Sequence, residues 1–375
     1  MKRKLAAILL STAMAVSLTA CGSSQSQEAG TSESAEGTEG TEEAGTGAGT
    51  EEVTEERPYY VRGEDEVTGT ITVYTTMEET QQEVLQELWR KYYPNCEMEI
   101  QADSVGTLAT RIRGDEDCDA DVVIGGMFAA DGDIYHDILQ PYTAACDAEQ
   151  LYHDEAGYYT FYDVEVLCLV VNSALRDELG VEINGYEDLL QPELEGKIVL
   201  SAPDSTSTGW RHLQTILAVM GDSFDDEKGW GYIGQLMPRS FCTTSSKDVY
   251  NLVSNGEYVV GLSYECVIAA LIKDGAPFEC VYMEEGNTAM AGGAAMVKDA
   301  PNPAAAEAML DLLSSKEFQE ARALKSAGRP SNGECELFGL PDESTLGMVD
   351  LDFQYLTDHK EAICNRWNEL LAESN

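Results

Sequence analysis

The sequence is poor in basic residues, and this shortage limits what the protein can bind. Only 23 lysines and arginines stand against 68 aspartates and glutamates, which gives a formal net charge of -45 at pH 7. Nucleic acids are bound largely through Lys and Arg contacts to phosphates, so we exclude nucleic acid as a partner. Such an acidic surface is typical of a soluble protein outside the cell.

Patterns typical of metal sites and hydrolases are also missing. The ten cysteines form no CxxC pair, and the four histidines lie in no HExxH arrangement. Neither a zinc site nor a disulfide framework follows, and we expect no metal and no cofactor. The segment Gly261-Leu262-Ser263-Tyr264-Glu265 lacks the last glycine of a nucleophile elbow, and His212 is assigned a structural role inside a helix. We therefore predict that the protein is not an enzyme; an exported hydrolase is the alternative from another class.

Long apolar runs are absent except at the N-terminus. Leu5 to Leu18 forms such a run behind the basic Lys2-Arg3-Lys4, but it is shorter than the roughly 20 apolar residues that span a bilayer. The run closes on Leu18-Thr19-Ala20-Cys21, which resembles a bacterial lipobox. This resemblance implies cleavage before Cys21 and lipid on its thiol. Residues 1–20 are thus predicted to be a lipoprotein signal peptide, and the protein is expected to be lipid-anchored on the extracytoplasmic face of the cell membrane.

The next segment lacks both aromatic and basic residues. Between Gly22 and Glu56 the chain consists mainly of Gly, Ser, Thr, Ala and Glu. Such a segment cannot bury enough apolar surface to offset its chain entropy. We predict that residues 21–57 form a disordered acidic tether that holds the folded part away from the membrane.

From residue 58 onward, predicted strands alternate with predicted helices. A strand is predicted at 69–74, and Thr76-Met77-Glu78-Glu79 has the spacing of a capping box at the start of the next helix. Further strands are predicted at 98–102, 120–126, 164–171, 197–201, 258–263, 279–283 and 292–297, and helices at 303–313, 316–324 and 359–372. This alternation predicts an α/β fold with mostly parallel sheets flanked by helices.

Loops rich in hydroxyl groups and glycine follow several of these strands. Ligands bind beyond the carboxyl ends of parallel strands, and helix N-termini favour anions. Ser and Thr at helix starts can equally serve as N-caps alone, and this alternative stays open. The candidate ligand-binding residues are Thr75, Thr76, Gly106, Thr107, Gly126, Ser205, Thr206, Ser207, Thr208, Ser245, Tyr264 and Glu265.

The order of several segments resembles the type 2 periplasmic binding proteins. The segments are Ile-Thr-Val-Tyr-Thr-Thr at 71–76, Ala-Asp-Val-Val-Ile-Gly-Gly at 120–126, the stretch 194–209 and the closing segment 292–298. The branch in question contains ferric-ion binders and relatives for phosphorylated sugars, aminoethylphosphonate, thiamine and polyamines. The resemblance covers roughly residues 69–333.

This resemblance implies a fold of two lobes joined by a two-segment hinge, near 161–166 and 282–291, that closes on a ligand. Lobe 1 would comprise residues 58–163 and 285–375, and lobe 2 residues 164–284. It also implies that the protein is a monomer that delivers a small molecule to an ABC transporter permease.

Departures from the family bear on the ligand. Ferric binders use an adjacent tyrosine pair after the strand at 258–263, where this chain has a single Tyr264 beside Glu265. The polar loops instead resemble those that hold a phosphate or phosphonate group, with Tyr264 and Glu265 engaging a cationic or hydroxyl portion. We expect a small anionic or zwitterionic metabolite of the phosphonate or phosphate-ester type. A cationic ligand of the polyamine or thiamine kind, held by Glu265 with Glu78 or Asp163, is the alternative.

Overall fold

The computed structural model describes residues 57–115 and 118–374. The predicted signal peptide, Cys21 and nearly all of the predicted tether lie outside these residues. Glu56–Asn375 forms one structural unit. No helix in the described ranges is both long enough and apolar enough to cross a membrane.

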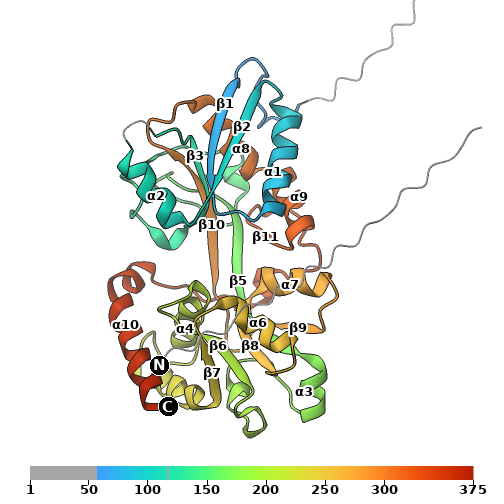
Figure 1. The fold of residues 1–375 in the computed structure, drawn as a ribbon, viewed down its shortest axis with the longest axis vertical. Coiled ribbons are helices and arrows are strands. Elements are labelled where there is room, and N and C mark those ends of the chain that lie inside the picture. Colours follow the sequence, from blue (N-terminus) through green and yellow to red (C-terminus); the bar gives the residue numbers. More distant parts are fainter. Residues whose placement is uncertain (1–56, 116–117, 375) are drawn as a thin grey trace, which may run out of the picture. The chain divides into compact units, whose positions relative to one another are not determined.

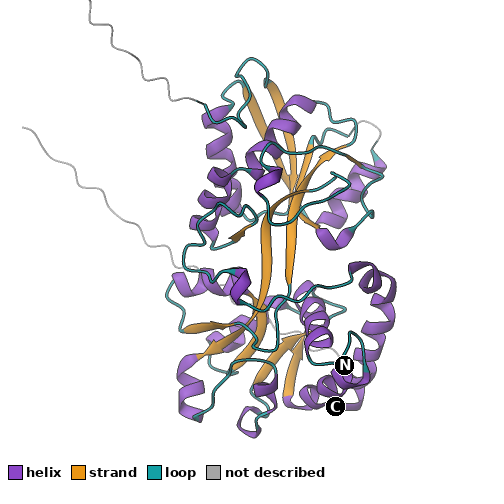
Figure 2. Cartoon of the chain, turned by 180° about the vertical axis from the view of Figure 1, so that it is seen from behind, coloured by secondary structure: helices purple, strands orange, loops and turns teal. Residues whose placement is uncertain are grey.

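The first lobe is built on three parallel strands in the order β2-β1-β3, extended by β10, which runs antiparallel to β3. Helices flank these strands (Figure 1 and Figure 2). The elements are β1 (Gly69–Thr75), α1 (Glu79–Tyr92), β2 (Cys96–Ala102), α2 (Val105–Gly114), β3 (Val122–Phe128), β4 (Leu139–Gln140), β10 (Ala289–Val297), α8 (Pro303–Ser314), α9 (Lys316–Ser326) and β11 (Arg329–Pro330).

The second lobe repeats this architecture. Strand β6 pairs in parallel with both β7 and β8, whereas β8 and β9 pair antiparallel with β5 (Thr160–Asn172). The predicted α/β fold is confirmed, but the sheet is mixed, because the strands that connect the lobes add antiparallel pairs. The elements are α3 (Ser173–Leu179), β6 (Ile198–Ser201), α4 (Ser207–Val219), α5 (Glu227–Leu236), β7 (Ser240–Thr243), α6 (Ser246–Ser254), β8 (Val260–Tyr264), α7 (Glu265–Lys273), β9 (Phe278–Val281) and α10 (Phe353–Ser374).

Two long antiparallel strands connect the lobes. Strand β5 (Thr160–Asn172) pairs with β10 between Thr160 and Val166, and its second part, Leu167 to Val171, pairs with β8. Figure 1 shows β5 and β10 running side by side between the two sets of helices. The crossing segments form a strand pair, whose register shifts between Gly292 and Gly293. The predicted segment 161–166 lies within β5, but only 289–291 of the predicted 282–291 lies within β10.

The C-terminal helix departs from the prediction, which placed all of residues 285–375 in lobe 1. Leu356, Ile363 and Trp367 of α10 are buried in the same core cluster as Leu213 and Trp230 of the second lobe. The prediction for this helix is wrong because its apolar face packs on lobe 2. Lobe 1 ends before it.

The start of α1 also differs from the sequence-based expectation. Its N-cap residue is Glu78, whose side chain makes no capping hydrogen bond, so the capping box predicted from Thr76 to Glu79 does not form. Thr76 packs instead against β3. A Cβ atom added to Gly125 would lie 2.5 Å from the Thr76 hydroxyl oxygen, and Gly125 has a positive φ of 80°. The double glycine therefore makes room for Thr76.

Candidate functional site

A cavity of about 510 Å³ lies between the two lobes. We call it the α4 chamber, because one wall is the first two turns of α4. Its lining residues include Val105, Gly126, Phe128, Asp131, Asp204, Ser205, Thr206, Ser207, Trp210, Arg211, Gln214, Phe353, Leu356, Thr357 and Lys360.

A second cavity of about 560 Å³ shares Gly126 and Phe128 with the α4 chamber. We call it the β5 chamber, because Asp163 and Glu165 of β5 line it. Since the two chambers share wall residues from lobe 1, they are neighbouring parts of one interlobe cleft. The β5 chamber is also lined by Thr76, Glu78, Gly125, Tyr162, Lys247, Tyr250, Cys266, Asp274, Arg322 and Lys325.

The structure brings five of the twelve predicted residues to this cleft. Gly126 lines both chambers, Ser205, Thr206 and Ser207 line the α4 chamber, and Thr76 lines the β5 chamber. The other seven line neither chamber. They are Thr75, Gly106, Thr107, Thr208, Ser245, Tyr264 and Glu265.

Several hydroxyl groups are occupied by hydrogen bonds within the protein. Thr206 caps α4 by accepting from the Gly209 amide, and Ser245 caps α6 by accepting from the Asp248 amide. Thr75 is buried and donates to the Ile124 carbonyl at 2.8 Å. The Thr107 hydroxyl bonds the Ser104 hydroxyl at 2.9 Å. For these side chains the N-cap or structural role is the observed one.

Glu265 does not face the cleft either. It is fully buried and forms a two-pronged ion pair with Arg329, at 2.5 Å from Nη2 and 3.0 Å from Nε. The Tyr282 hydroxyl donates a further bond to Glu265 at 2.5 Å. Because Glu265 is satisfied in this way, it is not available to hold a cationic ligand. The alternative that assigned this role to Glu265 needs another carboxylate.

Arg211, a cation of the α4 chamber, is not among the residues predicted from the sequence. Ser207, Trp210, Arg211 and Gln214 all line the chamber, and their spacing of three, four and seven residues places them on one face of α4. The guanidinium carbon of Arg211 lies 5.1 Å from the centre of the Phe128 ring. Arg211 follows the predicted binding residue Ser207 by four positions, and basic residues are rare in this chain. This combination is the sequence signal that could have identified Arg211.

Two polar atoms on this face lack a hydrogen-bond partner among the described residues. They are Nη1 of Arg211 and Oε1 of Gln214, and both are shielded from solvent by the protein. Gln214 is only 3 % exposed. An unpaired buried polar group is costly. These atoms therefore mark a place where a polar ligand would restore lost hydrogen bonds.

The β5 chamber carries two carboxylates on one face of its strand. Asp163 accepts from Nη2 of Arg322 at 2.7 Å, and Arg322 is 1 % exposed. Burial raises the pKa of Glu165 from its usual 4.5 to about 7, and the negative charge of Asp163 adds to this effect. Near neutral pH, Glu165 can thus gain or lose a proton.

The raised pKa of Glu165 makes the stability of the protein depend on pH. Between about pH 4.5 and 7 the native protein keeps a proton that the unfolded chain has lost, so this contribution to stability falls as pH rises through that window. We expect Glu165→Gln to remove this fall and to be more stable than the original protein at about pH 8, by about 1–3 kcal/mol. Urea unfolding at about pH 5 and pH 8 measures the free energy of unfolding of both proteins.

The exposed Glu97 provides the control, because Glu97→Gln should leave the pH dependence of stability unchanged. If stability changed with pH in Glu165→Gln as it does in the original protein, the raised pKa of Glu165 would be refuted.

His212 has the structural role predicted for it. It is buried, with Nδ1 2.9 Å from the Tyr186 hydroxyl and Nε2 3.0 Å from the Ser263 carbonyl oxygen. Burial lowers its pKa to about 4, so the ring is neutral at physiological pH. Neutral His212 accepts from Tyr186 and donates to Ser263.

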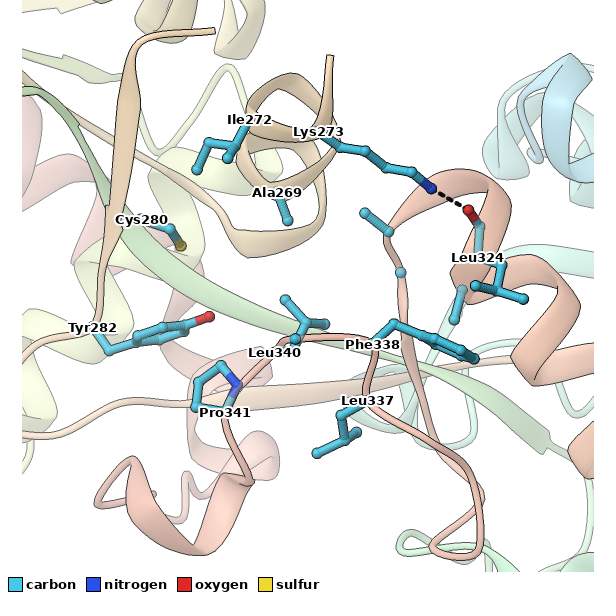
Figure 3. A pocket seen from close by; sticks show the side chains of 14 residues that line it. Ala269, Ile272, Lys273, Cys280, Tyr282, Leu324, Leu337, Phe338, Leu340 and Pro341 are labelled. Carbon is cyan, nitrogen blue, oxygen red and sulfur yellow. Dashed lines mark hydrogen bonds between the residues drawn. The ribbon is translucent and has the colours of Figure 1, made fainter. Parts of the chain in front are cut away.

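A further cavity, of about 600 Å³, lies outside the two chambers. Figure 3 shows it between α7, α9 and the segment around Leu337 to Pro341, and mainly apolar residues such as Ile272 and Phe338 line it. The Lys273 ammonium donates to the Leu324 carbonyl at its edge. None of the predicted site residues lines this cavity.

Comparison with known proteins identifies the family. Residues 70–328 match the family model described as bacterial extracellular solute-binding protein. An uncharacterized protein of Haemophilus influenzae is 26% identical over 210 residues, which span 54% of this chain and 60% of that relative's length.

Solved structures agree with this match. AfuA from Actinobacillus pleuropneumoniae, a periplasmic binding protein with fructose-6-phosphate bound, is 22% identical, with a TM-score of 0.67 over 81% of this chain and 99% of its own. Iron-bound HitA from Pseudomonas aeruginosa is 18% identical, with a TM-score of 0.65 over 80% of this chain and 99% of its own. Identities this low establish the fold alone. Together with the family match, they show that the chain belongs to the bacterial extracellular solute-binding proteins and has the type 2 periplasmic-binding-protein fold.

Proposed function

We propose that this protein binds a small anionic or zwitterionic metabolite, of the phosphate-ester or phosphonate type, and delivers it to an ABC transporter permease. The observation that carries the proposal is the shielded, unpaired Nη1 of Arg211 on the first turns of α4. Arg binds phosphate oxygens through its fixed fork of donors. The N-terminus of α4 adds the positive end of a helix dipole beside the same chamber.

The size and position of the chamber support this ligand class. About 510 Å³ lies within the range of cavities that enclose small molecules. Ser207 lies at the first position of α4 and lines the chamber. The protein's overall negative charge does not oppose binding strongly, because salt confines such repulsion to about 8 Å.

The residues expected to attach the protein to the membrane lie before the described part of the chain. We propose that residues 1–20 are a signal peptide, that Cys21 carries lipid, and that residues 21–57 tether a monomeric binding domain without catalytic activity. The lipobox-like Leu18-Thr19-Ala20-Cys21 supports the anchor. Recovery of a Cys21→Ala variant in the membrane fraction, in the same amount as the unaltered protein, would count against it.

A cationic ligand is the second candidate, and the β5 chamber is the observation that favours it. Asp163, Glu165 and Glu78 line that chamber. Asp163 is already paired with Arg322, so Glu165 would have to supply most of the charge. A structurally similar solved protein is a periplasmic thiamin binding protein, 18% identical with a TM-score of 0.64 over 80% of this chain and 96% of its own.

A thermal-shift panel separates the two candidates. The purified protein is screened with fructose 6-phosphate, 2-aminoethylphosphonate, spermidine, thiamine and Fe(III). We expect a phosphoryl compound to stabilise the protein most, by about 2.7 kcal/mol at a concentration of about 100 times its Kd. Stabilisation by spermidine or thiamine alone would reverse the ligand assignment in favour of the second candidate.

A further inference from the structure

The C-terminal helix α10 reaches the same chamber as Arg211. The helix begins at Phe353, beyond the residues 70–328 that match the family model. Phe353, Leu356, Thr357 and Lys360 line the α4 chamber, and their spacing places them on one face of α10. A segment outside the matched region therefore forms part of the wall of the candidate site.

Lys360 places a second positive charge in this chamber. Its ammonium nitrogen lies 5.3 Å from the centre of the Trp210 ring, and Trp210 is the neighbour of Arg211 on α4. Within the described ranges, Lys360 and Arg211 form no ion pair with a carboxylate within 4.0 Å. In a chain with 68 acidic and 23 basic residues, two cations that form no ion pair in one cavity call for an explanation.

The nearby carboxylates do not remove this charge. Asp131 lines the chamber and feels the charges of both Arg211 and Lys360, but its side chain accepts a bond from the Phe128 amide at 2.7 Å. Asp204 accepts from Ser205 and from Asn368. These neutral donors leave both carboxylates charged, but among the described residues neither carboxylate lies within 4.0 Å of the Arg211 guanidinium or the Lys360 ammonium. Both cations can therefore still contact an anionic ligand.

We infer that Lys360 is a specificity-determining residue of the site, which together with Arg211 selects ligands whose anionic group carries two negative charges. This inference rests on the proposed function and makes it more specific. Arg211 contacts the group from α4 and Lys360 contacts it from α10, so a doubly charged phosphoryl group gains from both cations. A singly charged diester of similar shape gains little from the second cation.

The test compares two ligands of similar shape and different charge. Phenyl phosphate is mainly a dianion at about pH 8, because the second pKa of a phosphate monoester is about 6, whereas methyl phenyl phosphate is a monoanion. Calorimetric titration of Lys360→Ala should show about a tenfold weaker affinity for phenyl phosphate and less than a twofold change for the diester. Lys360→Arg should retain most of the affinity.

A matched control lies on the same helix. Arg366 stacks its guanidinium 4.6 Å from the centre of the Trp230 ring and pairs with Glu227 at 2.7 Å, and it does not line the chamber. Arg366→Ala should therefore bind both probes as the unaltered protein does. Equal losses in Lys360→Ala and Arg366→Ala, or equal losses for both probes, would overturn the inference.

The outcomes also distinguish this inference from the proposed function. If the unaltered protein binds phenyl phosphate and Lys360→Ala binds it equally well, the role of Lys360 is refuted and the phosphoryl ligand stands. If the unaltered protein binds neither probe but binds spermidine, the phosphoryl ligand itself is refuted, and the role of Lys360 with it.

Discussion

Replacing Glu265 with alanine is expected to lower the free energy of unfolding by about 3–5 kcal/mol, because it leaves a buried charge without a partner. Arg329 is 1 % exposed and would keep only its bond to the Pro341 carbonyl oxygen, at 2.8 Å. The Tyr282 hydroxyl would lose its acceptor as well. Equilibrium unfolding in urea measures the loss.

An exposed ion pair provides the control for this prediction. Arg113 and Asp137 form a bond of 2.7 Å, with side chains 39% and 56% exposed. Asp137→Ala should cost no more than about 1 kcal/mol, as is usual for exposed pairs. If Glu265→Ala cost as little as Asp137→Ala, the buried pair would not contribute what its geometry indicates.

Arg211→Ala should weaken binding of a phosphate ester by about 30- to 150-fold, since a hydrogen bond to a charged group contributes about 2–3 kcal/mol. Ser207→Ala should have a smaller effect of the same sign, because Ser207 lines the same face of α4. Affinity for spermidine should not fall in either variant. Isothermal titration with fructose 6-phosphate and spermidine gives both values.

The control for Arg211 is an arginine of lobe 2 outside the cleft. Arg176 on α3 pairs with Asp177 at 2.9 Å and lines neither chamber. Arg176→Ala should leave the affinity for fructose 6-phosphate unchanged. A loss in Arg211→Ala that was matched by Arg176→Ala would point to a general electrostatic effect, and would refute a direct contact at Arg211.

The sequence was sufficient to predict strands and helices where local signals are strong. The strand predicted at 69–74 appears as Gly69–Thr75, and the helix predicted at 303–313 as Pro303–Ser314. Runs of apolar residues carry this information, because β1 is buried on both faces from Ile71 to Thr75 and most residues of α8 are buried. Apolar patterns cannot tell which lobe a final amphipathic helix packs against. The placement of α10 depended on the path of the chain after β11, which no local pattern records.

The candidate site was harder to predict for a related reason. A hydroxyl at a helix start satisfies backbone amides as well as it would bind an anion, and Thr206 and Ser245 do the former. Arg211 and Lys360 lie in helices whose buried faces were predictable, but which exposed face meets the cleft is set by tertiary packing. Charge alone did not identify them. Their shared position in the wall of the α4 chamber did.

The strand shared by both sheets has a mechanical consequence. Since β5 hydrogen-bonds to β10 in one part and to β8 in the next, the lobes are joined by paired backbones. A rotation between the lobes would twist this strand pair, in which the register shift at Gly292 and Gly293 interrupts the regular pairing. Closure on a ligand would therefore work against an elastic restoring torque, which would help to reopen the cleft once the ligand leaves.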